Sequence, residues 1–269
     1  MCDVIIRETN RKANTVFDMI NECNPTSEQR VWKVVTETEF DAYLGLLLLG
    51  GVTHSGYVDT KDLWKTTAHP LFRASMSVRR FWEISRFIRF DNGITREHRK
   101  QYDKAAAISD IFVMLNRNLR KYYTASANVT IDEQLYPFRG GTGFRQYIPS
   151  KPTKYGIKVW WMCDSITSYP LKGQIYTGKA ASGQREGNVG ERVVKDLCVG
   201  TLRESGRNIV CDNFFTTHNL AKQLMNDHKL SILGTVISAA DLCQNNCPLQ
   251  KSANQNPPYL HSVRALPCS

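Results

Sequence analysis

The sequence predicts a mixed α/β protein in which a mainly helical region precedes a mixed β-sheet with flanking helices. Up to about residue 127, apolar side chains recur at the spacing of amphipathic helices. From Asn128 onward, short runs rich in β-branched or apolar residues alternate with helical segments. At 269 residues, the chain is long enough for one large hydrophobic core or two smaller ones.

The segment 36–49 carries the clearest start signal for a helix. Thr36 and Glu39 form a Thr-x-x-Glu capping pattern directly before an apolar run. The pair Gly50 and Gly51 is expected to end this helix. Two further amphipathic helices are expected at 77–90 and 108–122.

The region that follows is expected to alternate between strands and helices. Its strands are predicted at 129–135, 158–163, 171–176, 208–212 and 230–236, and its helices at 190–197 and 217–228. Three strands followed by helix, strand, helix and strand indicate a mixed sheet with helices packed on its faces. This order matches the ribonuclease-H-like (RNase-H-like) fold.

These changes of pattern divide the chain into three parts. Residues 1–127 form the helical part and residues 128–236 the sheet. Residues 237–269 contain many Asn and Pro residues and little periodic hydrophobicity, so we expect an irregular or disordered tail. The sequence contains no internal repeat.

The net charge of +10 favours an acidic partner, with nucleic acid the first candidate. On charge alone, a basic surface without a specific partner explains this value equally well. The eight cysteines are too few for a disulfide scaffold in a chain of this length, so we expect reduced thiols. No signal-peptide pattern opens the sequence, and its longest apolar stretch, 44–52, is far shorter than the ~20 residues that span a membrane. We therefore expect a soluble, intracellular protein with no membrane partner.

Two aspartates are candidates for metal binding. Asp132 and Asp212 each stand near the end of an apolar strand, where a carboxylate reaches the rim of a sheet. Two such carboxylates on neighbouring strands can hold Mg²⁺, and a metal pair can support phosphodiester cleavage. The alternative is that both are ordinary strand-end residues. For Asp212, which precedes a helix, helix capping is a second alternative.

A basic segment lies between the first two predicted strands. It contains five cations and no acidic residue after Glu133, together with glycines and aromatic side chains suited to phosphate contact and stacking. An ordinary exposed hairpin has a similar composition, but the one-sided charge favours contact with DNA. The cations are Arg139, Arg145, Lys151, Lys154 and Lys158.

The tail contains a weaker candidate for a zinc site. Cys243 and Cys247 are separated by three residues, with His261 and Cys268 further along the chain. This spacing is not a standard zinc-finger pattern, and no hydrophobic frame surrounds it. A zinc site is therefore not favoured.

Four short motifs stand out along the chain. They are TIDEQL at 130–135, YIPSKPTKYGIK at 147–158, MCDS at 162–165 and NIVCDNFFT at 208–216. The first two together resemble the first catalytic motif of piggyBac-type transposases, MCDS is similar to that family's second strand, and NIVCDNFFT resembles its second catalytic motif. These matches occur in the family's order, and the resemblance extends over roughly 5–236.

The resemblance implies a cut-and-paste DNA transposase lineage with an RNase-H-like catalytic domain and a helical domain for dimerisation and DNA binding. It implies use of Mg²⁺ or Mn²⁺, double-stranded DNA with TTAA target sites as partner, a possible homodimer and a nuclear location. Carried over by residue, Asp132 and Asp212 are the first and second catalytic aspartates and metal ligands. The residues implied to lie close to DNA or the active site are Arg139, Lys151, Lys154 and Asn213.

The chain departs from the family pattern at the third catalytic aspartate, which follows the fifth strand in the family. Asp227 belongs to the helix between the fourth and fifth strands, and Asp241 lies in a tail that does not resemble the family. We therefore expect a C-terminally shortened, catalytically incomplete, DNA-binding derivative of the transposase. Two alternatives remain, namely an active metal-dependent nuclease that uses Asp241 and a decayed fragment without a selected function.

Overall fold

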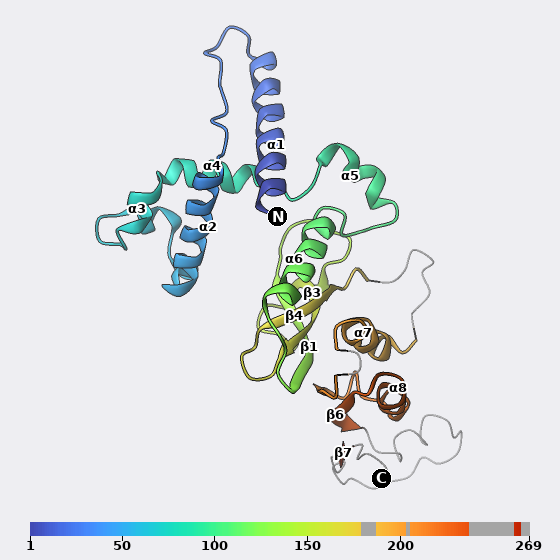
Figure 1. Ribbon diagram of the computed structural model, residues 1–269. Helices are drawn as coiled ribbons and strands as arrows, with labels where there is room; N and C mark the ends of the chain where they lie inside the picture. The colour runs from blue at the N-terminus through green and yellow to red at the C-terminus, as the bar shows by residue number, and fades with distance from the viewer. Residues whose placement is uncertain (179–186, 203–204, 237–260, 265–269) are drawn as a thin grey trace, which may run out of the picture. The chain divides into compact units, whose positions relative to one another are not determined.

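The computed structural model describes residues 1–178, 187–202, 205–236 and 261–264 (Figure 1). The chain divides into two compact units, Met1–Met114 and Leu115–Ser269. The predicted mixed α/β architecture, with helices preceding a mixed sheet, is confirmed. Within the described ranges, none of the helices is both long and apolar enough to cross a membrane.

The first unit is built from helices. In chain order they are α1 (Cys2–Cys23), α2 (Glu37–Val52), the short 3₁₀ helices η1 (Ser55–Tyr57) and η2 (Thr60–Trp64), α3 (Leu71–Ser75), α4 (Val78–Phe87), α5 (Gly93–Lys100) and the start of α6 (Ser109–Tyr122). Their core is aromatic: Trp32 packs edge-on against Phe87, with ring centroids 5.3 Å apart, and Phe17 packs against both rings.

Helix α2 begins as predicted but ends later. The Thr36 hydroxyl accepts a hydrogen bond from the Glu39 N–H, as the capping pattern requires. The expected end at Gly50 and Gly51 is wrong, because the helix continues through both to Val52. Neither glycine adopts a positive φ, so neither provides the left-handed turn that ends many helices.

A buried ion pair joins α2 to α4. The Arg80 guanidinium donates to both carboxylate oxygens of Glu39, at 2.8 and 2.7 Å, and to the Lys33 carbonyl at 2.7 Å. It also lies 4.6 Å from the centroid of the Trp32 ring. Burial opposes the charge of Arg80, but Glu39 more than compensates, so the pKa of Arg80 is raised. One side chain therefore connects two helices and the aromatic core.

The second unit contains the sheet. Its elements after α6 are β1 (Asn128–Pro137), β2 (Gln146–Tyr147), β3 (Tyr155–Asp164), β4 (Pro170–Ile175), α7 (Val189–Cys198), β5 (Asn208–Cys211), α8 (His218–His228), β6 (Ser231–Val236) and β7 (His261–Arg264). The main strand order is β2-β3-β1-β5-β6-β7, and β4 also pairs with β3. Strands β1, β5 and β6 are parallel, whereas β2, β3, β4 and β7 run antiparallel to their partners.

Helices pack against this sheet through a second hydrophobic core. Buried apolar residues of α7 and α8, which lie beside the strands in Figure 1, join buried residues of β1, β3 and β5 in one cluster. Helix α6 is fixed to β4 by Asn116, whose side-chain amide exchanges two hydrogen bonds with the Gly173 backbone, at 3.0 and 2.8 Å. These contacts hold the sheet and its helices as one unit.

Two strands were not expected from the sequence. Strand β2 has two residues and pairs with the start of β3. In the tail, His261–Arg264 forms β7 against β6, so the expectation of an irregular tail is wrong for these four residues. The rest of the predicted tail, 237–260 and 265–269, lies outside the described residues.

Candidate functional site

The two candidate aspartates occupy matching positions on neighbouring parallel strands. In the register of β1 and β5, Ile131 pairs with Cys211, and each aspartate is the next residue. Adjacent strands lie about 4.8 Å apart, so Asp132 and Asp212 lie side by side where the paired segments of β1 and β5 end. Both are exposed, while Ile131 and Cys211 are buried in the core. The fold thus presents two carboxylates side by side to solvent.

The local geometry of the two aspartates is the same. One carboxylate oxygen of Asp132 accepts a hydrogen bond from the next backbone N–H at 2.7 Å, and one of Asp212 does so at 2.6 Å. The remaining oxygen lone pairs suit a hard divalent cation, which takes oxygen ligands and retains several waters. The pair therefore fits part of an Mg²⁺ or Mn²⁺ site. Among the described residues, no group of three or more His, Cys, Asp or Glu side chains is arranged for a metal.

The turn after β5 is tightly held. The Asp212 carbonyl accepts hydrogen bonds from the Phe215 N–H at 3.1 Å and from the Thr216 hydroxyl at 2.9 Å. A Cβ atom at Gly190 of α7 would lie 2.3 Å from the Phe214 carbonyl oxygen. These contacts leave no space for a larger residue on the α7 side of the turn.

A second glycine restricts the turn from the side of β6. A Cβ atom at Gly234 would lie 2.1 Å from the Thr216 hydroxyl and 2.7 Å from the Cys211 carbonyl. Backbone approaches of this kind require glycine. The position of Asp212 is thus set by neighbours on both sides of the turn.

Helix capping does not explain Asp212. The N-cap of α8 is Thr217, whose hydroxyl accepts the Leu220 N–H at 3.1 Å. Asp212 lies five residues before this cap, and its carboxylate accepts the N–H of Asn213 instead. The side chain of Asp212 therefore remains available to a ligand.

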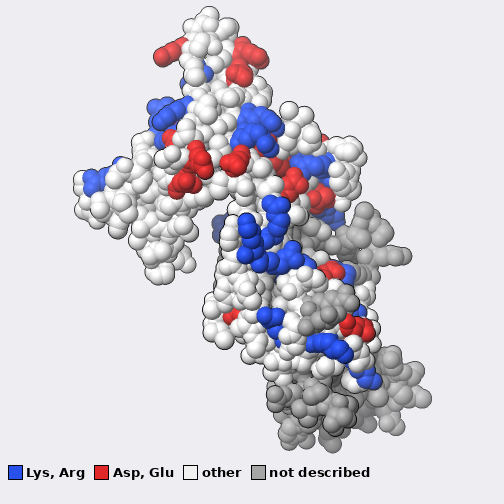
Figure 2. Space-filling view, viewed as in Figure 1, with Lys and Arg blue, Asp and Glu red and all other residues white. Residues whose placement is uncertain are grey.

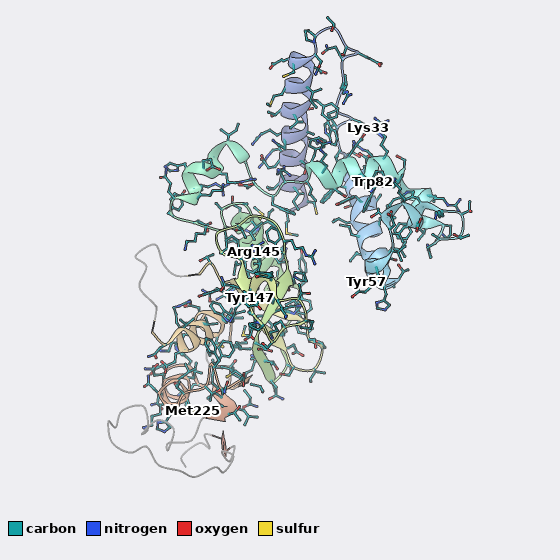
Figure 3. The ribbon with its side chains drawn as sticks, turned by 180° about the vertical axis from the view of Figure 1, so that it is seen from behind. Lys33, Tyr57, Trp82, Arg145, Tyr147 and Met225 are labelled. Atoms are coloured by element: carbon teal, nitrogen blue, oxygen red, sulfur yellow. The ribbon has the colours of Figure 1, made fainter. Side chains whose placement is uncertain are left out.

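The basic hairpin begins directly after β1 and carries the predicted cations. Arg139 and Lys154 are exposed, as is Asn213 beside Asp212. Lys151 is half-buried and forms a salt bridge with Glu133 at 3.2 Å, which ties the hairpin to the residue next to Asp132. Arg145, labelled with Tyr147 in Figure 3, donates to the Arg139 carbonyl at 3.1 Å.

Lys158 has a different environment from the other cations. Its ammonium lies 5.3 Å from the ring centroid of Trp160, 5.9 Å from that of Tyr176 and 5.5 Å from that of Phe214. Burial lowers its pKa from the ordinary lysine value, although the nearby carboxylates of Glu133 and Asp132 oppose this shift. Lys158 thus connects β3 to the turn that carries Asp212.

Asp164 is an acidic residue of the same sheet with a structural role. Its carboxylate is buried and accepts hydrogen bonds from the Ser126 N–H at 2.7 Å and the Thr167 N–H at 3.0 Å. These hydrogen bonds, that from Ser126 foremost, hold its pKa well below the usual range for aspartate. Because Asp164 pairs with Val129, it lies toward the start of β1, away from Asp132.

Asp227 does not join the site. It lies in the last turn of α8. Asp241 and the tail cysteines at 243, 247 and 268 lie outside the described residues, so the structure does not describe the zinc candidate. Sequence reasoning missed the glycines at 190 and 234 and the aromatic surroundings of Lys158, for which no local pattern gives a signal.

Comparison with known proteins identifies relatives along most of the chain. Residues 3–264 match the family described as Transposase IS4. Human PiggyBac transposable element-derived protein 3 is 27% identical over 199 residues, covering 71% of this chain and 32% of that protein. Human PiggyBac transposable element-derived protein 2 is 25% identical over 247 residues, covering 88% of this chain and 39% of that protein.

A solved structure is also similar. It is the cryo-EM structure of a piggyBac transposase synaptic complex with hairpin DNA, with a TM-score of 0.76 and 35% sequence identity. The match covers 87% of this chain and 48% of the other. The chain thus spans about a third of the length of the curated relatives and about half that of the solved one.

Proposed function

This chain belongs to the piggyBac-type transposase family, and from that premise we propose that it binds double-stranded DNA beside Asp132 and Asp212. The observation that carries the proposal is the matched position of the two exposed carboxylates next to a cationic hairpin. The salt bridge from Lys151 to Glu133 supports it, because it joins the hairpin to the strand that carries Asp132. The presence of DNA in the solved relative gives further support.

Each residue of the interface has a distinct part in this proposal. Asp132 and Asp212 provide two oxygen ligands for Mg²⁺ or Mn²⁺, which supplies Lewis acidity at a phosphate when bound. The exposed cations Arg139 and Lys154, together with Lys151, neutralise phosphates of the DNA backbone. Asn213 offers an amide to the strand that approaches Asp212. Arg145 holds the hairpin turn and adds positive charge to it.

We also propose that this chain shares further properties of its family. We assign the sheet to the RNase-H-like class because β4, β3, β1, β5 and β6 are adjacent in that order, with the last three parallel. Preference for TTAA sites, homodimerisation and a nuclear location belong to the same proposal. For the 269-residue polypeptide tested by itself, we propose DNA binding with little strand cleavage, because groups of a metal site act together and the described residues place no third ligand beside Asp132 and Asp212.

A salt titration tests the DNA interface. Binding to a TTAA-containing duplex is expected to weaken as salt rises, because cation–phosphate contacts release counterions. Changing Arg139, Lys151 and Lys154 together to glutamine should reduce the slope of log K against log salt by up to about three units. Lys222→Gln, at an exposed position on α8, is the matched control and should retain the slope. An unchanged slope in the triple variant would refute the interface.

A nicking assay with Mg²⁺ or Mn²⁺ tests the catalytic part separately. The wild-type chain and Asp132→Ala are expected to give the same low background. Metal-dependent nicking that disappears in Asp132→Ala would show an active nuclease, and the proposal of incomplete catalysis would then be wrong.

A pair of lysine variants compares the two ends of the basic hairpin. Lys154→Met should reduce the salt slope by about one unit, since Lys154 is exposed. Lys158→Met should reduce it by less, because three aromatic rings already surround its ammonium. Fluorescence anisotropy over a range of salt concentrations measures both slopes. A larger effect for Lys158→Met would contradict this assignment.

A further inference from the structure

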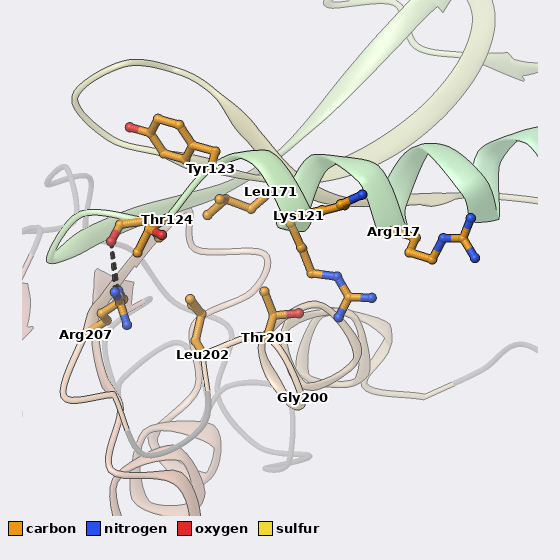
Figure 4. A pocket seen from close by; sticks show the side chains of 11 residues that line it. Arg117, Lys121, Tyr123, Thr124, Leu171, Gly200, Thr201, Leu202 and Arg207 are labelled. Atoms are coloured by element: carbon orange, nitrogen blue, oxygen red, sulfur yellow. Dashed lines mark hydrogen bonds between the residues drawn. The ribbon is translucent and has the colours of Figure 1, made fainter. Parts of the chain in front are cut away.

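The second unit contains a cavity away from the two aspartates. Its volume is about 490 Å³, and side chains from α6, from the segment before β1 and from the segment after α7 line it (Figure 4). Leu171 of β4 forms part of the wall, and Arg207 closes the side next to β5. The hydroxyl of Thr201, another lining residue, is shielded from solvent and has no hydrogen-bond partner.

The charge of this cavity is one-sided. Arg117, Arg120 and Lys121 are spaced i, i+3 and i+4 along α6, so they share one face of the helix. Figure 2 shows Lys and Arg side chains gathered over α6. Arg207 adds a fourth cation, and the described lining contains no carboxylate.

This arrangement is unfavourable without a partner. Like charges at i, i+3 and i+4 repel one another along a helix. No salt bridge joins these three α6 cations to a described carboxylate. The positive charge also affects Lys172 of β4. Its pKa is lowered mainly by burial and, to a smaller extent, by the charge of Arg120. A bound anion would remove the repulsion.

Cations at the end of a helix have an ordinary explanation, because they stabilise the C-terminal carbonyls. That explanation covers Arg120 and Lys121, which lie in the last turn of α6. It does not cover Arg117, one turn earlier, or Arg207, which comes from another segment. Arg207 is fixed in the wall by hydrogen bonds to the Ala125 carbonyl at 2.9 Å and the Ser126 carbonyl at 2.8 Å. The fold therefore holds Arg207 in place in the wall of the cavity.

The cavity lies at the opposite end of the sheet from the aspartates. Tyr123 and Arg207 precede the first residues of β1 and β5, whereas Asp132 and Asp212 stand near or after the ends of the paired segments. Asp212 follows Arg207 by five positions, which is roughly 16 Å along an extended strand. One phosphate group cannot contact both places.

We propose that this cavity binds a phosphate group. Arg117 and Arg120 provide guanidinium donors suited to phosphate oxygens, and Lys121 adds a point charge. Tyr123 stacks on Tyr169 with ring centroids 4.3 Å apart, which gives the wall a rigid aromatic part. The site shares no residue with the DNA interface proposed above, so it does not depend on that interface.

The first experiment uses pyrophosphate as the probe. Titration into the full chain, followed by amide NMR shifts, should move the signals of Thr124 and Thr201. The Arg117→Gln, Arg120→Gln double variant should bind at least about tenfold more weakly, because it loses charge-assisted hydrogen bonds. Lys222→Gln is the matched control and should bind like wild type.

Both replaced arginines are exposed on α6, so the double variant should keep its hydrophobic core. Thermal melting that matches wild type establishes that the double variant is folded. No shift with pyrophosphate, or equal affinity in the folded double variant, would overturn the proposal.

A second arm identifies the source of the phosphate. A lower salt slope for duplex DNA in the double variant indicates a phosphate of the DNA backbone. An unchanged slope, with pyrophosphate binding lost, indicates a small phosphorylated ligand. Both results uphold the site. Loss of DNA binding in the hairpin triple variant with pyrophosphate binding retained would confirm that the two sites are separate.

Discussion

Replacing Phe215 by alanine is expected to lower the free energy of unfolding of the second unit by about 3–5 kcal/mol. Phe215 is fully buried in the sheet core, and its removal leaves a cavity beneath the turn that carries Asp212. Urea unfolding followed by tryptophan fluorescence measures the loss. Alanine keeps the backbone N–H that donates to the Asp212 carbonyl, but it removes the buried ring that anchors this turn, so the folded fraction should bind Mn²⁺ more weakly.

The adjacent residue provides the matched control. Phe214 is 51% exposed, so Phe214→Ala should cost less than about 1 kcal/mol even though it removes a ring beside Lys158. If the two alanine variants lost equal stability, the turn would not be anchored through Phe215 as described.

Replacing Arg80 by methionine should destabilise the first unit by about 3 kcal/mol. The Arg80 side chain is 9% exposed and that of Glu39 is 16% exposed, so the change leaves a poorly hydrated carboxylate without its partner. It also removes the cation over the Trp32 ring. Denaturant unfolding followed by circular dichroism at the helical band measures the effect.

Arg79 is the control for this prediction because it is the neighbouring residue of the same type. Its side chain is 88% exposed, and it pairs with Glu83 on the helix surface at 3.2 Å. Such pairs contribute little, so Arg79→Met should change the stability by about 0.5 kcal/mol or less. A similar loss of stability in both variants would show that the buried ion pair with Glu39 contributes no more than the surface pair.

For α2, local signals in the sequence predicted the start of the helix better than its end. The capping pattern at Thr36 fixed the start of α2, since a hydroxyl three residues before a free N–H acts at short range. The end of α2 was wrong because Gly50 and Gly51 permit a left-handed turn without requiring it. The two-residue β2 is too short for any periodic pattern.

The candidate site depended on contacts between distant residues. The sequence showed that Asp132 and Asp212 each follow an apolar run, but only the pairing of β1 with β5 makes them neighbours. The resemblance to a family supplied their expected roles as first and second catalytic aspartates, which nothing in the local sequence indicates. No such guide existed for the phosphate cavity. Arg117 and Arg207 are far apart in the chain, and cations on one helix face usually indicate a solvated surface.

The parallel pairing of β1 and β5 has a consequence for the order in which this protein folds. The two strands are separated along the chain by β3, β4 and α7, so their contact closes a long loop. Contacts of such large sequence separation form slowly compared with helices and hairpins. The two carboxylates therefore become a pair only late in folding. Under the proposed metal binding, affinity for a divalent ion at these two carboxylates would therefore report that the chain has reached its final topology, rather than that its local elements have formed.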